Sequence, residues 1–158
     1  MKVQKDALKN VEWFGQSSSV QSIFMGILGS LLAAGPFLVP YFFVLVSARG
    51  GTVPIYLLIP FFLFALFGNF FEEVLFRVIL QDYLFEKVGQ KRSIFLSALF
   101  FATGHIFLAT TVTSVGPLIL IFTFWEGLIC ASLKPKYGIM ASTIAHGLTI
   151  FILSSGLI

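Results

Sequence analysis

Charged residues are scarce in this sequence. Seven Asp and Glu and ten Lys and Arg together make up 11% of its 158 residues, whereas a soluble domain usually carries about 25%. This scarcity excludes a water-soluble globule, a disordered region and a nucleic-acid binder, although the net charge is +3. Hydrophobic residues reach 58% and occur in runs of about 20, the length that crosses a bilayer as a helix. The sequence therefore predicts an all-α integral membrane protein, a polytopic transmembrane helix bundle.

Cysteine is nearly absent as well. The single residue, Cys130, excludes an intramolecular disulfide and is expected to be a small core residue because it lies in an apolar run. Internal repeats and low-complexity linkers are also missing. We therefore expect one membrane-embedded domain over residues 1–158, in which residues 1–19 form a polar cytoplasmic segment. The first apolar run is too long for a signal peptide and has no small-residue cleavage site, so we expect a retained span.

The apolar runs predict about five spanning helices. The first is interrupted by Pro36 and Pro40, which predict a kink. A polar, amphipathic segment at residues 81–92 follows the second span, and Lys134-Pro135-Lys136 is expected to form the turn between the last two. The predicted spans are residues 20–46, 53–80, 93–112, 117–133 and 137–158.

The basic residues predict the orientation of this bundle. With the N-terminus inside, eight of them fall in cytoplasmic segments and only Arg49 falls outside, as the positive-inside rule requires. This split favours an N-in, C-out arrangement. The eight inside residues are Lys2, Lys5, Lys9, Lys87, Lys91, Arg92, Lys134 and Lys136.

Six ionisable residues lie inside the predicted spans, where a charge costs about 2.5–3.5 kcal/mol at the helix centre. Such residues normally face the bundle interior, pair with one another and mark a functional site. This set is the most informative feature of the sequence. It comprises Glu72, Glu73, Arg77, His105, Glu126 and His146.

The two adjacent glutamates are expected to have different roles. Glu73 and Arg77 are four residues apart, so they share a helix face in the order that a helical ion pair prefers. Glu72 points about 100° away, on the face of Asn69, and has no cation on its own helix. We therefore expect Glu73 and Arg77 to compensate each other and Glu72 to be available for chemistry.

Three helices place a carboxylate and two imidazoles in one layer. Counted from the expected cytoplasmic ends of their spans, Glu72, His105 and His146 lie roughly 12–18 Å deep at 1.5 Å per residue. A carboxylate and one histidine can polarise a water, and the other histidine can hold an oxyanion. A Glu and two His can also bind zinc. We rank a metal-dependent mechanism second, and predict no metal and no cofactor.

These residues resemble the CPBP family of intramembrane proteases, also called the CAAX protease and bacteriocin-processing family. Its Glu-Glu-x-x-x-Arg motif is matched by Glu72, Glu73 and Arg77. Its Phe-x-x-x-His motif is matched by Phe101 and His105, and its His-x-x-x-Asn motif is matched in part by His146. The resemblance covers about residues 60–150. At the last position Ile150 stands where the family has asparagine.

The resemblance implies a glutamate-dependent intramembrane endopeptidase. By analogy, Glu72 and His105 activate water and His146 stabilises the oxyanion, with Glu73 and Arg77 in support. Phe101 is expected to pack beside the site. Because Ile150 leaves part of the oxyanion site unassigned, Thr149 and Asn69 are candidates to replace the asparagine and line the cavity. No motif of the family includes Glu126, which is a candidate to pair with a histidine, line the cavity or face a polar lumen.

The expected substrate is a membrane-tethered protein or peptide: a C-terminal processing or sorting signal, a bacteriocin precursor or a CAAX-like tail. The bilayer is the other expected partner, in a bacterial or archaeal cytoplasmic membrane with the site open to the cytoplasm. One alternative is a non-catalytic immunity or partner-binding protein on the same scaffold. A small ion-coupled transporter would also use buried Glu and His, but no pair of repeats supports it.

Overall fold

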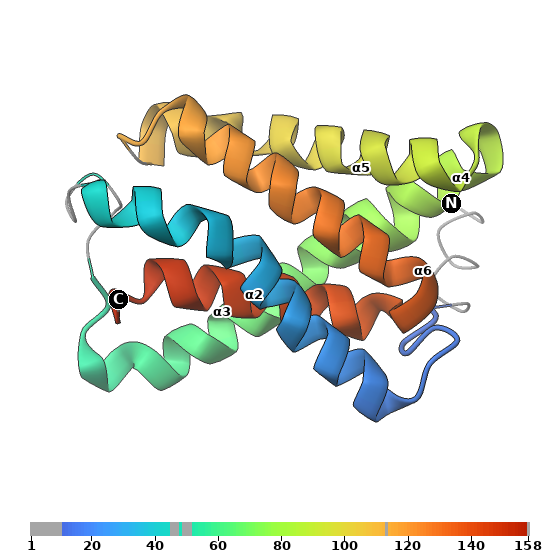
Figure 1. Cartoon of the computed structure of the whole chain (residues 1–158), viewed down its shortest axis with the longest axis horizontal. Coiled ribbons are helices and arrows are strands. Elements are labelled where there is room, and N and C mark those ends of the chain that lie inside the picture. Colours follow the sequence, from blue (N-terminus) through green and yellow to red (C-terminus); the bar gives the residue numbers. More distant parts are fainter. Residues whose placement is uncertain (1–10, 45–47, 49–51, 113, 158) are drawn as a thin grey trace.

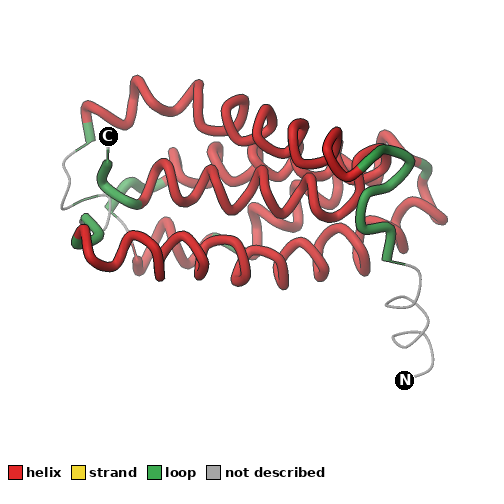
Figure 2. The backbone as a smooth tube through the Cα atoms, turned by 90° about the horizontal axis from the view of Figure 1, so that it is seen from below, coloured by secondary structure: helices red, strands yellow, loops and turns green. Residues whose placement is uncertain are grey.

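The structure is a computed structural model that describes residues 11–44, 48, 52–112 and 114–157. Throughout this part of the chain the regular structure is helical (Figures 1 and 2). The α-helices are α2 (Ser19–Phe43), α3 (Leu58–Glu73), α4 (Asp82–Val88), α5 (Gln90–Gly104) and α6 (Pro117–Ser154). The shorter elements are the 3-10 turn η1 (Ile55–Leu57) and two π-helical segments, η2 (Val74–Gln81) and η3 (Leu108–Val112).

Among the described residues, three helices are long and apolar enough to cross a membrane. They are Ser19–Pro40, Ile55–Val88 and Pro117–Ser154. The second runs from η1 to the end of α4, so the chain stays helical into the polar segment expected at residues 81–92 until Gly89 ends it with φ 80°. The all-α fold is thus confirmed over the described residues, with three helices able to cross a membrane. The five-span count and the N-in orientation stay predictions. Lys2, Lys5, Lys9 and Arg49 lie outside the described residues.

The helix α6 reverses direction at Gly138, as its two arms in Figure 1 show. Gly138 has φ 76°, a conformation that glycine adopts without the steric cost of a side chain. The expected turn at Lys134-Pro135-Lys136 is therefore displaced, because these three residues still belong to the first arm. The second arm begins after the glycine.

The segment before α2 covers this reversal. The backbone amides of Ile139 and Met140, at the start of the second arm, donate to the carbonyls of Glu12 and Trp13 at 3.1 Å each. The first amides of a helix have no partner within the helix, and such groups are costly to leave unpaired in an apolar surrounding. Residues 12–13 therefore act as a backbone cap on the second arm of α6.

Two prolines inside helices are accommodated by hydrogen bonds from side chains on other helices. Proline has no amide hydrogen to donate to the carbonyl four residues earlier. The Leu32 carbonyl therefore lacks its helical partner because of Pro36, and the Ala131 carbonyl lacks its partner because of Pro135. Trp125 Nε1 donates to the Leu32 carbonyl at 3.1 Å. Gln81 Nε2 likewise donates to the Ala131 carbonyl at 2.9 Å. Side chains from elsewhere in the fold thus replace the two lost helical hydrogen bonds.

The helix α5 is shorter than the predicted third span. It ends at Gly104, and η3 follows from Leu108 to Val112. The hydropathy pattern does not reveal this interruption, because the whole stretch is apolar. As a result His105 lies at a helix end rather than within a continuous helix.

The helix α6 packs against α2, α3 and α5 and forms the centre of the molecule. Its contact with α2 is close because Gly29 of α2 faces Leu133 and Ala145, and a Cβ added at Gly29 would lie 2.7 Å from Leu133 Cδ1. Small residues of this kind let helices approach closely in membranes, where packing rather than the hydrophobic effect joins them. The buried core there includes Cys130, as expected.

Candidate active site

The residues of the Glu-Glu-x-x-x-Arg motif lie where α3 passes into the π-helical segment η2. Glu72 and Glu73 end α3, and Arg77 lies within η2. π-Helical turns are rare and occur frequently at functional sites. The motif is therefore carried by a locally widened helix rather than by the regular α-helix that the sequence predicts.

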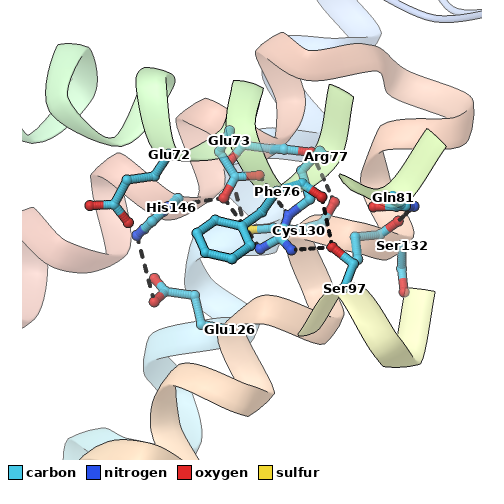
Figure 3. A network of polar contacts seen from close by, with 12 residues as sticks. Glu72, Glu73, Phe76, Arg77, Gln81, Ser97, Glu126, Cys130, Ser132 and His146 are labelled. Carbon is cyan, nitrogen blue, oxygen red and sulfur yellow. Dashed lines mark hydrogen bonds and ion pairs between the residues drawn. The ribbon is translucent and has the colours of Figure 1, made fainter. Parts of the chain in front are cut away.

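Glu73 and Arg77 form the expected ion pair, and both side chains are fully buried. Arg77 Nε lies 2.9 Å from Glu73 Oε2, and Arg77 Nη2 donates to Glu73 Oε1 at 3.4 Å. Arg77 Nη1 also donates to the hydroxyl of Ser97 on α5 at 2.8 Å, and that hydroxyl donates to the Phe76 carbonyl (Figure 3). This network joins η2 to α5 and closes Glu73 off from solvent.

Glu72 points away from this network and pairs with His105. Its Oε2 lies 3.2 Å from His105 Nε2, and the Glu72 side chain is 40% exposed, against 13% for His105. The other ring nitrogen of His105, Nδ1, lies 2.7 Å from the Phe101 carbonyl. Because a carbonyl can only accept a hydrogen bond, Nδ1 carries a proton and donates it to Phe101. This hydrogen bond holds the ring with Nε2 facing Glu72.

The backbone of His105 holds this orientation. His105 caps the C-terminus of α5 with φ −98° and ψ 11°, in the sparsely populated bridge region where many active-site residues lie. Its amide donates to the Ala102 carbonyl at 3.0 Å. The early end of α5 is therefore what turns this imidazole towards α3.

His146, on the second arm of α6, lies between two carboxylates. Its Nδ1 is 3.0 Å from Glu73 Oε1, and its Nε2 is 3.9 Å from Glu126 Oε2 (Figure 3). His146 and Glu126 are 2% and 1% exposed. The sequence predicted the six ionisable residues as one group, and the structure brings all six together.

The ring of Phe101 packs among these groups. It is fully buried, lies 4.3 Å from the His105 ring and 5.3 Å from the His146 ring, and has the Arg77 guanidinium 4.9 Å from its centroid. These contacts fix both imidazoles against one rigid wall. Phe101 thus has the packing position that the sequence predicts.

A cavity of about 540 Å³ opens beside the Glu72–His105 pair. Its polar lining gathers residues that the sequence singled out, namely Asn69, Glu72, His105, Glu126 and His146, and the rest is mostly aromatic and aliphatic. Ile150 lies in this wall, and the Nδ2 of Asn69 has no hydrogen-bond partner among the described residues.

Thr149 differs from the expectation. It is fully buried and does not line this cavity, and its hydroxyl donates to the Ala145 carbonyl at 2.7 Å. Its hydroxyl also lies 3.4 Å from the Ser30 carbonyl on α2, on the side of α6 that packs against that helix. Thr149 therefore offers no donor to a ligand there.

Sequence reasoning missed one member of the buried network, Ser97. A signal was present: Ser97, Phe101 and His105 follow at intervals of four residues, which places them on one helix face. Within the described residues, no group of three or more His, Cys, Asp or Glu side chains has the arrangement of a metal site.

Comparison with known protein families matches residues 54–152 to the type II CAAX prenyl endopeptidase Rce1-like family. The chain belongs to this family. The match covers more than half of the chain and contains every residue of the site described above, so the resemblance to CAAX proteases is confirmed. No curated protein and no solved structure matches the chain.

Membership of this family, together with the three apolar helices, identifies an integral membrane protein of a protease family. The family bears the name of an endopeptidase, an enzyme that hydrolyses internal peptide bonds. The same name refers to prenylated substrates.

Proposed function

We propose that this protein is an intramembrane endopeptidase that cleaves a membrane-tethered peptide with a water activated by Glu72 and His105. The observation that carries the proposal is the Glu72–His105 pair at the wall of the cavity. A general base must be within hydrogen-bond reach of the proton that it takes. Of the two adjacent glutamates, Glu72 is the accessible one, because both oxygens of Glu73 are occupied by Arg77 and His146.

The reaction needs only water and the peptide. The water oxygen attacks the carbonyl carbon while its proton passes to the Glu72 carboxylate, and His105 Nε2 holds that carboxylate in place. Negative charge develops on the carbonyl oxygen, where a preorganised donor stabilises it, a role that we assign to His146. The C–N bond then breaks, and Glu72 returns the proton to the leaving nitrogen, which yields a carboxylic acid and an amine.

The cavity wall favours a substrate with an apolar, membrane-embedded part. Four phenylalanines, Phe37, Phe64, Phe107 and Phe122, line the cavity. Such surroundings accept a lipid-like chain better than a charged peptide. The family name points the same way, towards a prenylated or otherwise membrane-tethered tail. We assign this class of substrate to the chain on that basis.

The test compares membrane peptidomes of cells that express the wild type, Glu72→Gln or Glu86→Gln. Glu86 is exposed on α4 and serves as the matched control. We expect a new peptide terminus with the wild type and the control, and none with Glu72→Gln. A terminus that persists with Glu72→Gln would refute the proposed chemistry.

Metal dependence is tested on the purified protein. Reconstituted in lipid nanodiscs, it should cleave the peptide identified above at the same rate before and after dialysis against a chelator. If the rate is lost and returns with zinc, a metal ion rather than the Glu72–His105 pair activates the water.

Ile150 favours a second candidate, a non-catalytic partner-binding protein on the same scaffold. This apolar side chain lies in the cavity wall, where it offers no donor to an oxyanion. Under this candidate, Glu72→Gln would leave the cellular phenotype unchanged, and no peptide terminus would depend on the wild-type protein.

A further inference from the structure

Glu126 is a buried carboxylate in the cavity to which the proposed reaction gives no role. It is 1% exposed, and neither of its oxygens has a hydrogen-bond partner within the described part of the chain. A carboxylate in such a place is unfavourable unless a charge or a proton compensates it. Among the described residues, the base at ion-pair distance from it is His146, whose Nε2 lies 3.9 Å from Oε2 (Figure 3).

The other nitrogen of His146 is already committed. Nδ1 lies 3.0 Å from Glu73 Oε1, and Glu73 is held as a carboxylate by its ion pair with Arg77. A carboxylate only accepts hydrogen bonds, so His146 Nδ1 carries a proton. What His146 presents to the cavity therefore depends on whether Nε2 carries a second proton.

The charges of the cluster balance when it does. Three acids and three bases lie together, with His146 beside both Glu73 and Glu126. With all three acids ionised, the charges sum to zero when both imidazoles are protonated. Burial in a membrane strongly favours such pairing over isolated charges. The contacts are Glu73–Arg77, Glu72–His105 and the two contacts of His146, with Glu73 and with Glu126.

We propose that Glu126 is a positioning residue that keeps His146 doubly protonated, so that Nε2–H is available as a donor to the cavity. At 3.9 Å the two atoms are too far apart for a direct hydrogen bond but close enough for strong charge pairing in a low-dielectric site. The charge of Glu126 thus stabilises the proton on Nε2, while the N–H group stays free of a hydrogen bond to Glu126. The role of this donor at an oxyanion rests on the proposed function, whereas the protonation of His146 does not.

Nitrogen NMR of the histidine rings tests the protonation directly. The chain has only two histidines, so protein labelled with ¹⁵N-histidine in nanodiscs gives two ring spectra, and His105→Ala assigns them. We expect both nitrogens of His146 to be protonated at neutral pH in the wild type and in Glu86→Gln. In Glu126→Gln only Nδ1 should keep its proton. A singly protonated His146 in the wild type, or a doubly protonated His146 in Glu126→Gln, would overturn the proposal.

Two substitutions separate a role of the charge from a role in packing. Gln keeps the shape of Glu126 but removes the carboxylate, whereas Asp keeps the carboxylate and leaves a gap. We expect Glu126→Gln to lower kcat by about 10- to 100-fold, less than the roughly 100- to 1,000-fold for loss of a whole oxyanion donor, with KM changed less than about threefold. Glu126→Asp should retain most of the rate. The reverse order would show a packing role and refute the proposal.

The double variant links Glu126 to His146. In a His146→Gln background, Glu126→Gln should cause no further loss of kcat, because the donor that it maintains is already gone. Additive losses would overturn the assignment. If the wild type cleaves no peptide at all, the proposed function fails, and the NMR result still decides whether Glu126 keeps His146 protonated.

Discussion

Two adjacent glutamates should give opposite phenotypes when each is replaced by glutamine. Glu73 is fully buried and compensates Arg77, whereas the side chain of Glu72 is 40% exposed and faces the cavity. Glutamine has nearly the same shape as glutamate, so each substitution removes a charge without creating a gap. The pair therefore separates the structural carboxylate from the chemical one.

The magnitudes follow from burial. Glu73→Gln leaves Arg77 as an uncompensated buried charge, which typically costs about 3–5 kcal/mol. For a chain of this size about 1 kcal/mol corresponds to roughly 2–4 °C in Tm, so we expect Tm to fall by roughly 6–20 °C. Loss of the more exposed Glu72 pair costs about 0–1 kcal/mol. Loss of a general base lowers kcat by about 100-fold or more.

The assay measures thermal unfolding and cleavage on the same nanodisc preparations, with Glu86→Gln as the control. We expect Glu72→Gln to unfold within roughly 4 °C of the wild type and to be inactive, and Glu73→Gln to be strongly destabilised. Normal turnover by Glu72→Gln would refute its role as the base. Equal destabilisation by the two substitutions would refute the division of roles derived from their burial.

Three further predictions concern the fold. Trp125→Phe removes the donor to the Leu32 carbonyl, which Pro36 leaves without a helical partner. The free energy of unfolding should therefore fall by about 1–3 kcal/mol, and an unchanged value in chemical denaturation would contradict this. Gly138→Ala should lower the free energy of unfolding by at least about 1–3 kcal/mol, because an alanine is strained at the positive φ of this position. The added Cβ would also lie 2.5 Å from backbone atoms, and wild-type stability would contradict the prediction. In a Cys130→Ala background, an impermeant thiol reagent added outside intact cells should label Ser114→Cys and not Glu86→Cys, and the reverse pattern would overturn the N-in orientation.

Local patterns sufficed for several features of the site. The spacing of Glu73 and Arg77 predicted their ion pair, because helix geometry alone places residues four apart on one face. The same geometry separated Glu72 from that pair. The unusual presence of ionisable groups in apolar runs singled out Glu126 and His146 as functional candidates, and it left the role of Glu126 open.

Other features were outside the reach of local patterns. The sequence placed the last turn at Lys134-Pro135-Lys136, because proline normally interrupts a helix, but the helix continues to Gly138. It continues because Gln81 satisfies the carbonyl that Pro135 leaves free. No pattern within α6 encodes a donor that comes from another helix.

The sequence by itself determined the membrane class, the helical structure and the family, because composition, apolar length and motif spacing are properties of the chain alone. It also singled out the six ionisable residues as candidates. Only the tertiary structure decided which histidine meets which carboxylate. The rotation and packing of α3, α5 and α6 about one another set those pairs, His105 with Glu72 and His146 between Glu73 and Glu126. Those pairs are contacts between helices, and they exist only after the helices have packed.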